Sequence, residues 1–248
     1  LDLYGEKDKR YKAFFKDTYY VNKATDATGT KYTWSQADAT RYRLDMARVG
    51  NPAFDITLGD TAVYISRKPM TQAERDARRY ATFTVDMNYA DPAKPLKFFP
   101  SLKKADTPSL YAGSNANKPY SAADCIVYRL GETYLLSAEI EWRLGNLPGA
   151  KSRLDDLRNR SCEGHDHSMD VSTSDINSDF LLDEYAREMI GEWNRWMTLK
   201  RFRAFESRIA KCNPQINRFN KDIHYLRPIP NAEMQLIDNP DEYQNPGY

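Results

Sequence analysis

The segment 121–160 constrains the fold more than any other part of the sequence. Apolar side chains recur at helical spacing from Val127 to Trp142, which indicates one amphipathic helix. Gly145 follows this stripe, and Pro148 is typical of the first turn of a new helix. We therefore predict two antiparallel helices that are joined at Gly145, with the first one opening near the cap residues 121–124.

Small side chains lie where these two helices would touch. Ala138 and Ala150 fall where the 34-residue tetratricopeptide helix pair has small residues, and Tyr134 and Leu154 fall where it has large ones. One such pair cannot bury its own apolar face, and the sequence contains no second clear copy. An ordinary helical hairpin therefore fits the pattern equally well, and a tetratricopeptide-type adaptor that binds proteins stays open as an alternative function.

The remaining patterns predict a mainly α fold with long irregular loops. Apolar residues at helical spacing in 182–199 predict one long helix, and Ser35 and Thr71 predict the starts of two short ones. Alternation on both sides of a Gly-Asp turn predicts a small β-hairpin over 54–68. We expect a loop-rich region with this hairpin in residues 1–120, and a helical region that forms one structural unit in residues 121–248.

The charge balance and the cysteine count exclude several classes of protein. The chain has 36 Lys and Arg against 35 Asp and Glu, a net charge of +1, whereas affinity for nucleic-acid phosphates requires a basic face. No apolar run approaches the roughly 18 residues of a membrane-spanning helix. The three cysteines form no C-x-x-C pair, so we expect no disulfide framework. A protein that binds no nucleic acid is the expectation.

One cluster has the residue types of a zinc site. Cys162, His165 and His167 lie within six residues of one another, and zinc prefers thiolate and imidazole ligands. Their spacing matches no closed four-ligand set, and the next histidine, His224, is distant in sequence. We favour a solvated loop between helices and expect no metal.

Carboxylates four residues apart form the other candidate for chemistry. Glu184, Glu188 and Glu192 would share one helix face, and paired carboxylates can serve in acid–base catalysis. Arg187 and Arg195 each follow a glutamate by three residues, so ion pairs are the simpler interpretation. Nucleophile and nucleotide-binding motifs are missing from the sequence. We expect no catalytic residue and no cofactor, and a glycoside hydrolase is the least favoured alternative.

Four stretches of the chain carry a family resemblance. They are residues 128–139, the helical run 184–201, the segment 225–230 and the closing Gln-Asn-Pro-Gly-Tyr of residues 244–248. With these stretches the chain strongly resembles the SusD/RagB family. The positions that match the family's structural motifs are Glu188, Glu192, Arg195, Trp196, Pro228, Pro230, Asn245 and Pro246. Tyr185 and Thr198 depart from the usual residues, which predicts a weaker internal ion-pair network.

The resemblance implies a SusD-like helical scaffold and a non-enzymatic function. Members of this family are cell-surface lipoproteins of the outer membrane that take part in nutrient uptake. They hold an oligosaccharide, or in some cases a peptide, for a SusC-like TonB-dependent transporter. Family members are about twice as long, so the resemblance also implies that this chain is the C-terminal portion, and that the lipid-attachment cysteine belongs to an N-terminal half that the chain does not contain.

A small set of residues in the loop-rich region has the composition of a sugar site. Sugar rings stack their CH faces on aromatic side chains, while their hydroxyls require polar neighbours. Tyr32, Trp34, Arg41 and Tyr42 combine these properties within eleven residues. We expect them to bind the ligand, although packing beneath a loop is the more common role of such aromatic residues.

The tail of the chain is dense in proline and asparagine, and it also carries apolar residues. Leu226, Ile229, Met234 and Ile237 are of the type that proteins bury. We therefore expect residues 225–248 to pack on the body of the protein, with Tyr243 and Tyr248 contributing apolar surface.

Overall fold

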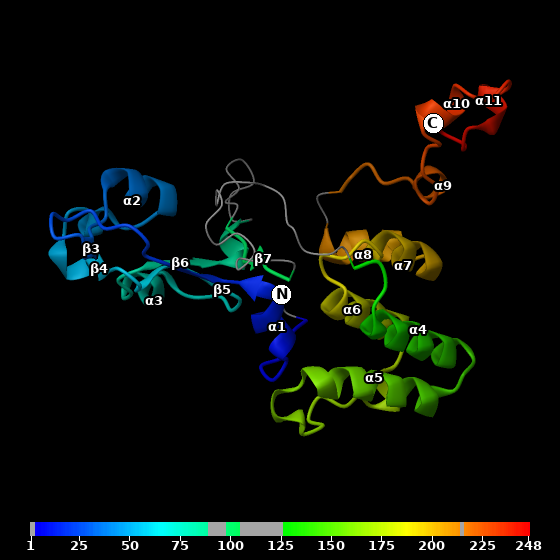
Figure 1. Ribbon diagram of the computed structural model, residues 1–248, viewed down its shortest axis with the longest axis horizontal. Helices are drawn as coiled ribbons and strands as arrows, with labels where there is room; N and C mark the ends of the chain where they lie inside the picture. Colours follow the sequence, from blue (N-terminus) through cyan, green and yellow to red (C-terminus); the bar gives the residue numbers. More distant parts are fainter. Residues whose placement is uncertain (1–2, 89–97, 105–125, 214–215) are drawn as a thin grey trace. The chain divides into compact units, whose positions relative to one another are not determined.

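The computed structural model describes residues 3–88, 98–104, 126–213 and 216–248 (Figure 1). It divides the chain into two compact units. The first contains Leu1–Val127 and Arg158–Met169, and the second contains Tyr128–Leu157 and Asp170–Tyr248. Helices predominate and the strands are short, which confirms the expected mainly α fold class.

The first unit consists of short helices and three small sheets. Its elements are α1 (Lys9–Phe14), β1 (Phe15–Lys16), β2 (Thr18–Tyr20), β3 (Lys31–Tyr32), α2 (Gln36–Tyr42), β4 (Ile56–Thr57), β5 (Thr61–Ser66), α3 (Gln72–Asp76), β6 (Ala81–Thr84) and β7 (Ser101–Leu102). Strand β5 is the centre of a three-stranded sheet, antiparallel to β2 and parallel to β6. The other two sheets are the antiparallel pairs β1–β7 and β3–β4.

The predicted β-hairpin over 54–68 is wrong, although both of its segments contain strands. β4 pairs with β3 and β5 pairs with β2 and β6, so the two predicted partners belong to different sheets. The turn between them explains the separation. Gly59, at a φ of +87°, donates its N–H to Val21 rather than across a hairpin, and the Asp60 carboxylate accepts the N–H of Thr57 at 2.9 Å.

The two short helices of this unit begin where the sequence predicts. Ser35 and Thr71 each form a capping box with the third residue of the helix, Asp38 and Glu74 respectively. Helix α2 ends before Arg43, which takes the left-handed conformation, and α3 ends at Asp76. The core of the unit lies beside α2 and gathers the buried side chains Val21, Trp34, Ile56, Ala81 and Phe83.

The second unit is built from helices. They are α4 (Leu130–Arg143), α5 (Leu147–Ser161), α6 (Ser178–Glu188), α7 (Arg195–Phe202), α8 (Phe205–Cys212), α9 (Lys221–His224), α10 (Asn231–Met234) and α11 (Pro240–Tyr243). No helix in the described part of the chain has both the length and the apolar character that crossing a bilayer requires.

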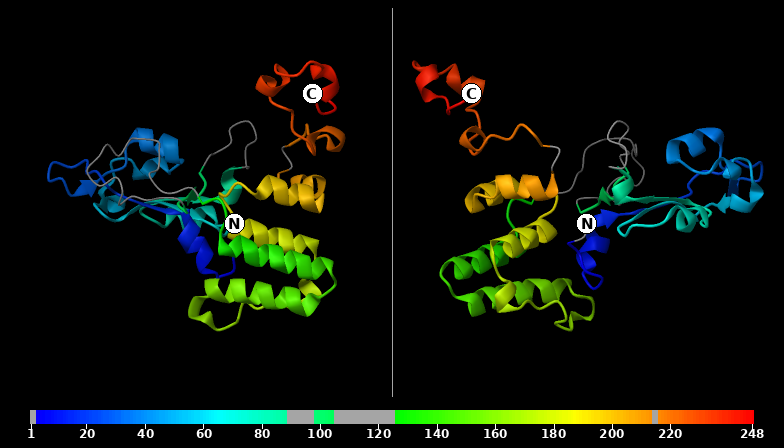
Figure 2. Two further views of the ribbon diagram at one scale, coloured as in Figure 1. Left: turned by 45° about the vertical axis from the view of Figure 1, so that its right-hand side comes forward. Right: turned by 180° about the vertical axis from the view of Figure 1, so that it is seen from behind.

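The helical hairpin around Gly145 is confirmed. Helices α4 and α5 lie side by side (Figures 1 and 2), and Gly145 takes a φ of +79° between them. Ala138 and Ala150 are both fully buried in one apolar cluster. The start of the hairpin differs from the prediction: the cap residues 121–124 lie outside the described residues, Val127 precedes the helix, and Leu130 at its first position is 70% exposed.

The long helix predicted over 182–199 is wrong, because the chain breaks between α6 and α7. Gly191 sits in this break with a φ of +78°. The carbonyl of Glu188, at the end of α6, accepts a hydrogen bond from the Arg129 guanidinium at 2.6 Å. That bond satisfies a backbone acceptor that a continuing helix would have used, so the helix can end inside the unit. Glu192 consequently lies outside α6, and the three glutamates do not share a helix face.

The tail packs on α7 and α8 through aromatic side chains. The ring centroids of Phe205 and Tyr225 are 5.0 Å apart, and those of Trp196 and Phe205 are 4.5 Å apart. The Arg227 guanidinium lies 4.8 Å from the centroid of the Trp196 ring. Contacts of Tyr225 and Arg227 with α7 and α8 are thus confirmed, whereas none of the apolar residues Leu226, Ile229, Met234 and Ile237 is fully buried. Trp196 is half-buried rather than fully buried.

The end of the tail folds back by hydrogen bonds instead of tyrosine burial. The Gln244 side chain accepts the N–H of Ile229 at 2.8 Å and donates to its carbonyl at 3.1 Å, and Asn245 donates to the carbonyl of Arg227 at 2.7 Å. Tyr243 and Tyr248 are 54% and 47% exposed, so the expectation that they supply buried surface is wrong. Pro228, Pro230 and Pro246 are exposed as well.

Candidate functional site

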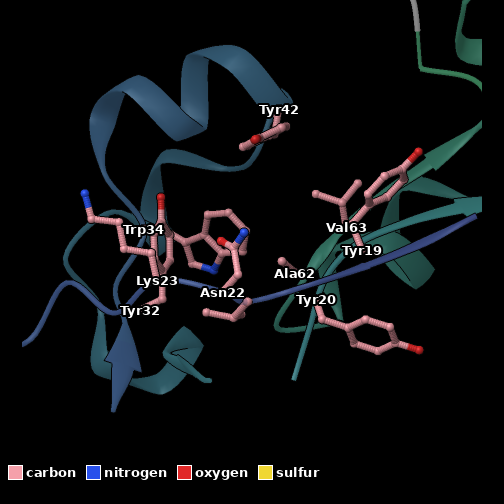
Figure 3. Close-up of a pocket in the computed structure, with 10 residues that line it drawn as sticks. Tyr19, Tyr20, Asn22, Lys23, Tyr32, Trp34, Tyr42, Ala62 and Val63 are labelled. Carbon is pink, nitrogen blue, oxygen red and sulfur yellow. The ribbon is translucent and has the colours of Figure 1, made fainter. Parts of the chain in front are cut away.

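Three of the four residues predicted to bind ligand line one pocket. Tyr32, Trp34 and Tyr42 border a cavity of about 220 Å³ in the first unit (Figure 3). The fourth residue, Arg41, does not line it. Arg41 is exposed, and its guanidinium lies 5.6 Å from the centroid of the Tyr42 ring.

Local structure around α2 brings the three aromatic residues together. Tyr32 belongs to β3, Trp34 immediately precedes the capping residue of α2, and Tyr42 is the last residue of that helix. The ring of Trp34 packs edge-on against the rings of Tyr32 and Tyr42. The ring centroids are 5.6 Å apart in the first pair and 6.2 Å apart in the second. The two capping hydrogen bonds at Ser35 fix the first turn of α2, and with it the spacing of the two outer rings.

Trp34 is the floor of the pocket and not a freely accessible platform. It is 3% exposed, and its indole N–H donates to the carbonyl of Arg79 at 3.0 Å. A buried indole with a satisfied N–H holds its position without ligand. The packing role that we weighed against binding therefore applies to Trp34, while Tyr32 and Tyr42 remain half-exposed.

The hydroxyl of Tyr32 is held by a carboxylate. It donates to Asp38 Oδ2 at 2.8 Å. Burial, together with this hydrogen bond and the negative charge of Asp38, raises the pKa of Tyr32 to about 12. Tyr32 is therefore a neutral phenol at physiological pH, and its hydroxyl proton is hydrogen-bonded to Asp38.

The sequence interpretation missed other residues that line the pocket. Tyr19, Tyr20, Asn22 and Lys23 line it from β2 and the residues that follow. The ring of Tyr20 is 60% exposed and points away from Trp34 in Figure 3. The adjacent tyrosines were the available signal, because two neighbouring residues of a strand face opposite sides of the sheet.

The chemistry of the pocket suits binding. Flat rings stand beside a primary amide at Asn22 and an ammonium group at Lys23, a mixture typical of ligand pockets. Its volume lies below the about 300–1,000 Å³ of sites that enclose a drug-sized ligand. It therefore accommodates one ring of a longer molecule. The described residues that line it include no carboxylate, so the two facing carboxylates of a glycoside hydrolase are not found among them.

Two of the matching motif residues in the second unit, Glu188 and Glu192, form ion pairs with Arg129. Arg129 donates to Glu188 at 2.6 Å and to both carboxylate oxygens of Glu192 at 3.0 Å. Glu184 pairs with Arg187 at 2.6 Å, as the sequence predicts. Arg195 donates to the carbonyl of Leu182 at 2.9 Å, so its observed partner is a carbonyl rather than Glu192. The Arg129 bonds connect the start of α4 to the end of α6, and the Glu184–Arg187 pair lies within α6.

The residues at the two departures, Tyr185 and Thr198, both form hydrogen bonds. The hydroxyl of Tyr185 donates to Glu139 at 3.1 Å, and the same carboxylate accepts two hydrogen bonds from Arg201, at 2.9 and 2.8 Å. Thr198 is buried, and its hydroxyl donates to the carbonyl of Asn194 at 3.0 Å. Both departures thus find local partners.

The zinc-type cluster is a hydrogen-bonded loop. The buried Cys162 thiol lies 3.2 Å from Asp166 Oδ1, and Lys7 pairs with the same carboxylate at 2.7 Å. His165 Nδ1 contacts the carbonyl of Asn159 at 2.8 Å, which turns that nitrogen away from Cys162 as a ligand partner. Within the described ranges, no group of His, Cys, Asp and Glu side chains could hold a metal ion.

Comparison with known proteins places the whole chain in one group. A family model described as the SusD family matches residues 1–248. No curated protein matches the chain.

Proposed function

Because the chain belongs to the SusD family, we propose that it binds oligosaccharide nutrients at the pocket of Tyr32, Trp34 and Tyr42 and passes them to a SusC-like TonB-dependent transporter. Members of the family are in general non-catalytic, glycan-binding proteins of the outer membrane that work with such transporters. The proposal includes the cell-surface face of that membrane as the location and a lipid anchor as the attachment.

The observation that carries the proposal is the composition of the pocket. The half-exposed rings of Tyr32 and Tyr42 offer flat apolar faces, and the exposed side chains of Asn22 and Lys23 offer hydrogen-bond donors beside them. A sugar presents CH groups on one face and hydroxyls around its edge, so it matches both features. A peptide is the other ligand class. Its backbone N–H and C=O groups would need hydrogen-bond partners along an extended line, whereas this pocket suits one ring.

Titration with glycans tests the proposal. We expect isothermal calorimetry on a panel of neutral and acidic oligosaccharides to find at least one ligand. The double variant Asn22→Ala, Lys23→Ala should weaken its binding, because both side chains are exposed at the rim of the pocket and neither belongs to the core. Each lost hydrogen bond is expected to cost about 0.5–1.5 kcal/mol, so the pair should reduce affinity by about 5- to 140-fold.

A matched control separates site effects from general ones. Lys221→Ala removes an exposed lysine from α9 in the second unit, and it should leave glycan affinity unchanged. Tyr42→Phe keeps the ring and its packing while removing the hydroxyl. If the wild-type protein binds peptides and no glycan, or if the double variant binds glycans as the wild type does, this pocket is not the glycan site.

A further inference from the structure

A second cavity in the first unit carries an excess of positive charge. It has a volume of about 450 Å³, and Lys12, Lys16 and Lys103 line it together with a single carboxylate, Asp17. The chain as a whole is nearly neutral at +1. A net charge of +2 at one cavity, three lysines less one aspartate, is therefore a local feature and not a reflection of composition.

The fold brings these lysines together from separate elements. Lys12 lies on α1, Lys16 is the second residue of β1, and Lys103 directly follows β7. β1 and β7 pair antiparallel with Lys16 opposite Ser101, and the N–H of Lys103 donates to the carbonyl of Phe14 at 2.8 Å. Backbone hydrogen bonds thus fix the main-chain positions of Lys16 and Lys103.

The ammonium groups are available for a ligand. Among the described residues, Lys12, Lys16 and Lys103 form no salt bridge, whereas other lysines of this unit do, such as Lys7 with Asp166 at 2.7 Å. The Lys16 ammonium lies 5.0 Å from the centroid of the Tyr19 ring, a contact that orients it without neutralising it. Three positive charges around one cavity, offset among its described lining residues by Asp17 alone, attract an anion.

Tyr20 joins this cavity to the aromatic pocket. Its side chain lines both cavities, and its exposed ring points away from Trp34 (Figure 3). The two cavities therefore share one lining residue of β2, and a ligand that occupied both would pass Tyr20. The aromatic pocket accommodates a single ring, so a longer ligand needs such a continuation.

We propose that the lysine cavity is an anion subsite, and that the glycan bound by this protein carries negatively charged groups, either carboxylates of uronic acids or sulfate esters. The inference rests on the proposed function, because it names the substrate class of the same site. Lys12, Lys16 and Lys103 recognise the charge, while the aromatic pocket recognises a neighbouring ring.

Binding of three oligosaccharides of equal length tests the inference. Oligogalacturonate supplies carboxylates, a chondroitin sulfate oligosaccharide supplies sulfates, and a β-galactan oligosaccharide is neutral. The wild-type protein should bind at least one acidic ligand more tightly than the neutral one. The preference should fall with added salt, because salt screens exposed charges. The relative affinity for the two acidic ligands identifies the anion.

Two charge variants separate this subsite from the rest of the fold. The double variant Lys12→Gln, Lys16→Gln should weaken binding of the acidic ligand by about 3- to 10-fold, as expected for two exposed charge contacts. The variant Lys12→Arg, Lys16→Arg should retain it. Lys221→Gln, far along the chain in α9, is the matched control and should have no effect. Equal thermal melting curves for all variants would exclude unfolding as the cause.

The outcomes also separate this inference from the proposed function. If the protein binds the neutral ligand as tightly as the acidic ones, or if the glutamine variant keeps full affinity for an acidic ligand, the anion subsite is refuted and glycan binding stands. If none of the three ligands nor any other glycan binds, the proposed function fails and this inference fails with it.

Discussion

Replacing Glu139 with glutamine should destabilise the second unit, because this buried carboxylate connects three helices. Glu139 lies on α4 and is 3% exposed. Arg201 of α7 donates Nε to one carboxylate oxygen at 2.9 Å and Nη2 to the other at 2.8 Å. Arg143 donates to it at 3.0 Å, and the hydroxyl of Tyr185 on α6 donates at 3.1 Å.

The size of the effect follows from these contacts. Hydrogen bonds to a charged group contribute about 1.5–3 kcal/mol each. The side chains of Arg201 and Arg143 are 38% and 45% exposed, so water screens much of the charge interaction. A glutamine side chain still accepts hydrogen bonds through its remaining carbonyl oxygen. We therefore expect Glu139→Gln to lower the free energy of unfolding by about 1–3 kcal/mol at pH 7.

The effect should depend on pH in one direction. Burial raises the pKa of Glu139, but the hydrogen bonds and positive charge of Arg201, with help from Arg143 and Tyr185, outweigh it and hold the pKa below its ordinary value of 4.5. The folded state thus has the lower pKa, so the carboxylate stabilises the fold fully above its ordinary, unfolded-state pKa. That contribution is lost as the pH falls through the folded-state pKa. The difference between wild type and variant should be constant from neutral pH to about 5 and shrink in more acidic solution.

Urea denaturation followed by circular dichroism at several pH values measures both quantities. The exposed Glu163→Gln variant, whose side chain lies outside this network, serves as the matched control and should follow the wild type. A difference below about 0.5 kcal/mol at pH 7 would place Glu139→Gln among ordinary surface substitutions and refute the reasoning. A difference that grows as the pH falls below 4 would reverse the sign of the pKa argument.

Three further predictions concern packing, the tail and the site. Ala138→Leu should lower stability by about 1–3 kcal/mol in thermal melting, because the alanine is fully buried between α4 and its neighbours, while Ala210→Leu on the exposed face of α8 should not. Gln244→Ala removes both hydrogen bonds to Ile229. This variant, or deletion of residues 239–248, should destabilise the second unit and increase hydrogen exchange in the rest of the tail. A deletion without effect on stability, together with an unprotected tail in the wild type, would refute this. Asp38→Asn should lower the pKa of Tyr32 from about 12, because the nearby negative charge is removed, as measured by the ultraviolet absorbance of the phenolate; an unchanged titration would contradict the contact.

Local signals in the sequence predicted three helix ends correctly. Gly145 ends α4, and Ser35 and Thr71 cap α2 and α3, because a cap or a left-handed residue acts on hydrogen bonds within four residues. The burial of Ala138 and Ala150 followed from periodicity alone. The family stretches added the scaffold and the expectation of a sugar ligand, which residue patterns by themselves did not provide.

Contacts between distant residues decided what the sequence could not. The break of the predicted long helix is stabilised by Arg129, which donates to a carbonyl 59 residues away. Nothing in the helical periodicity of residues 182–199 reports such a partner. The prediction of the β-hairpin was wrong for the same reason. A strand pairs with the strand edge that lies beside it in the fold, and β4 and β5 pair with strands of different sheets.

The candidate site shows the same division between local and distant information. The cluster Tyr32, Trp34 and Tyr42 was visible because these rings lie within eleven residues, and their proximity is set by one short helix. Strand pairing places Tyr20 and the lysines of the second cavity, and the sequence alone did not reveal them as ligand-binding candidates. A sequence determines chemistry and local conformation at each position, whereas the pairing of β1 with β7 and of β2 with β5 decides which charges and rings a ligand meets together.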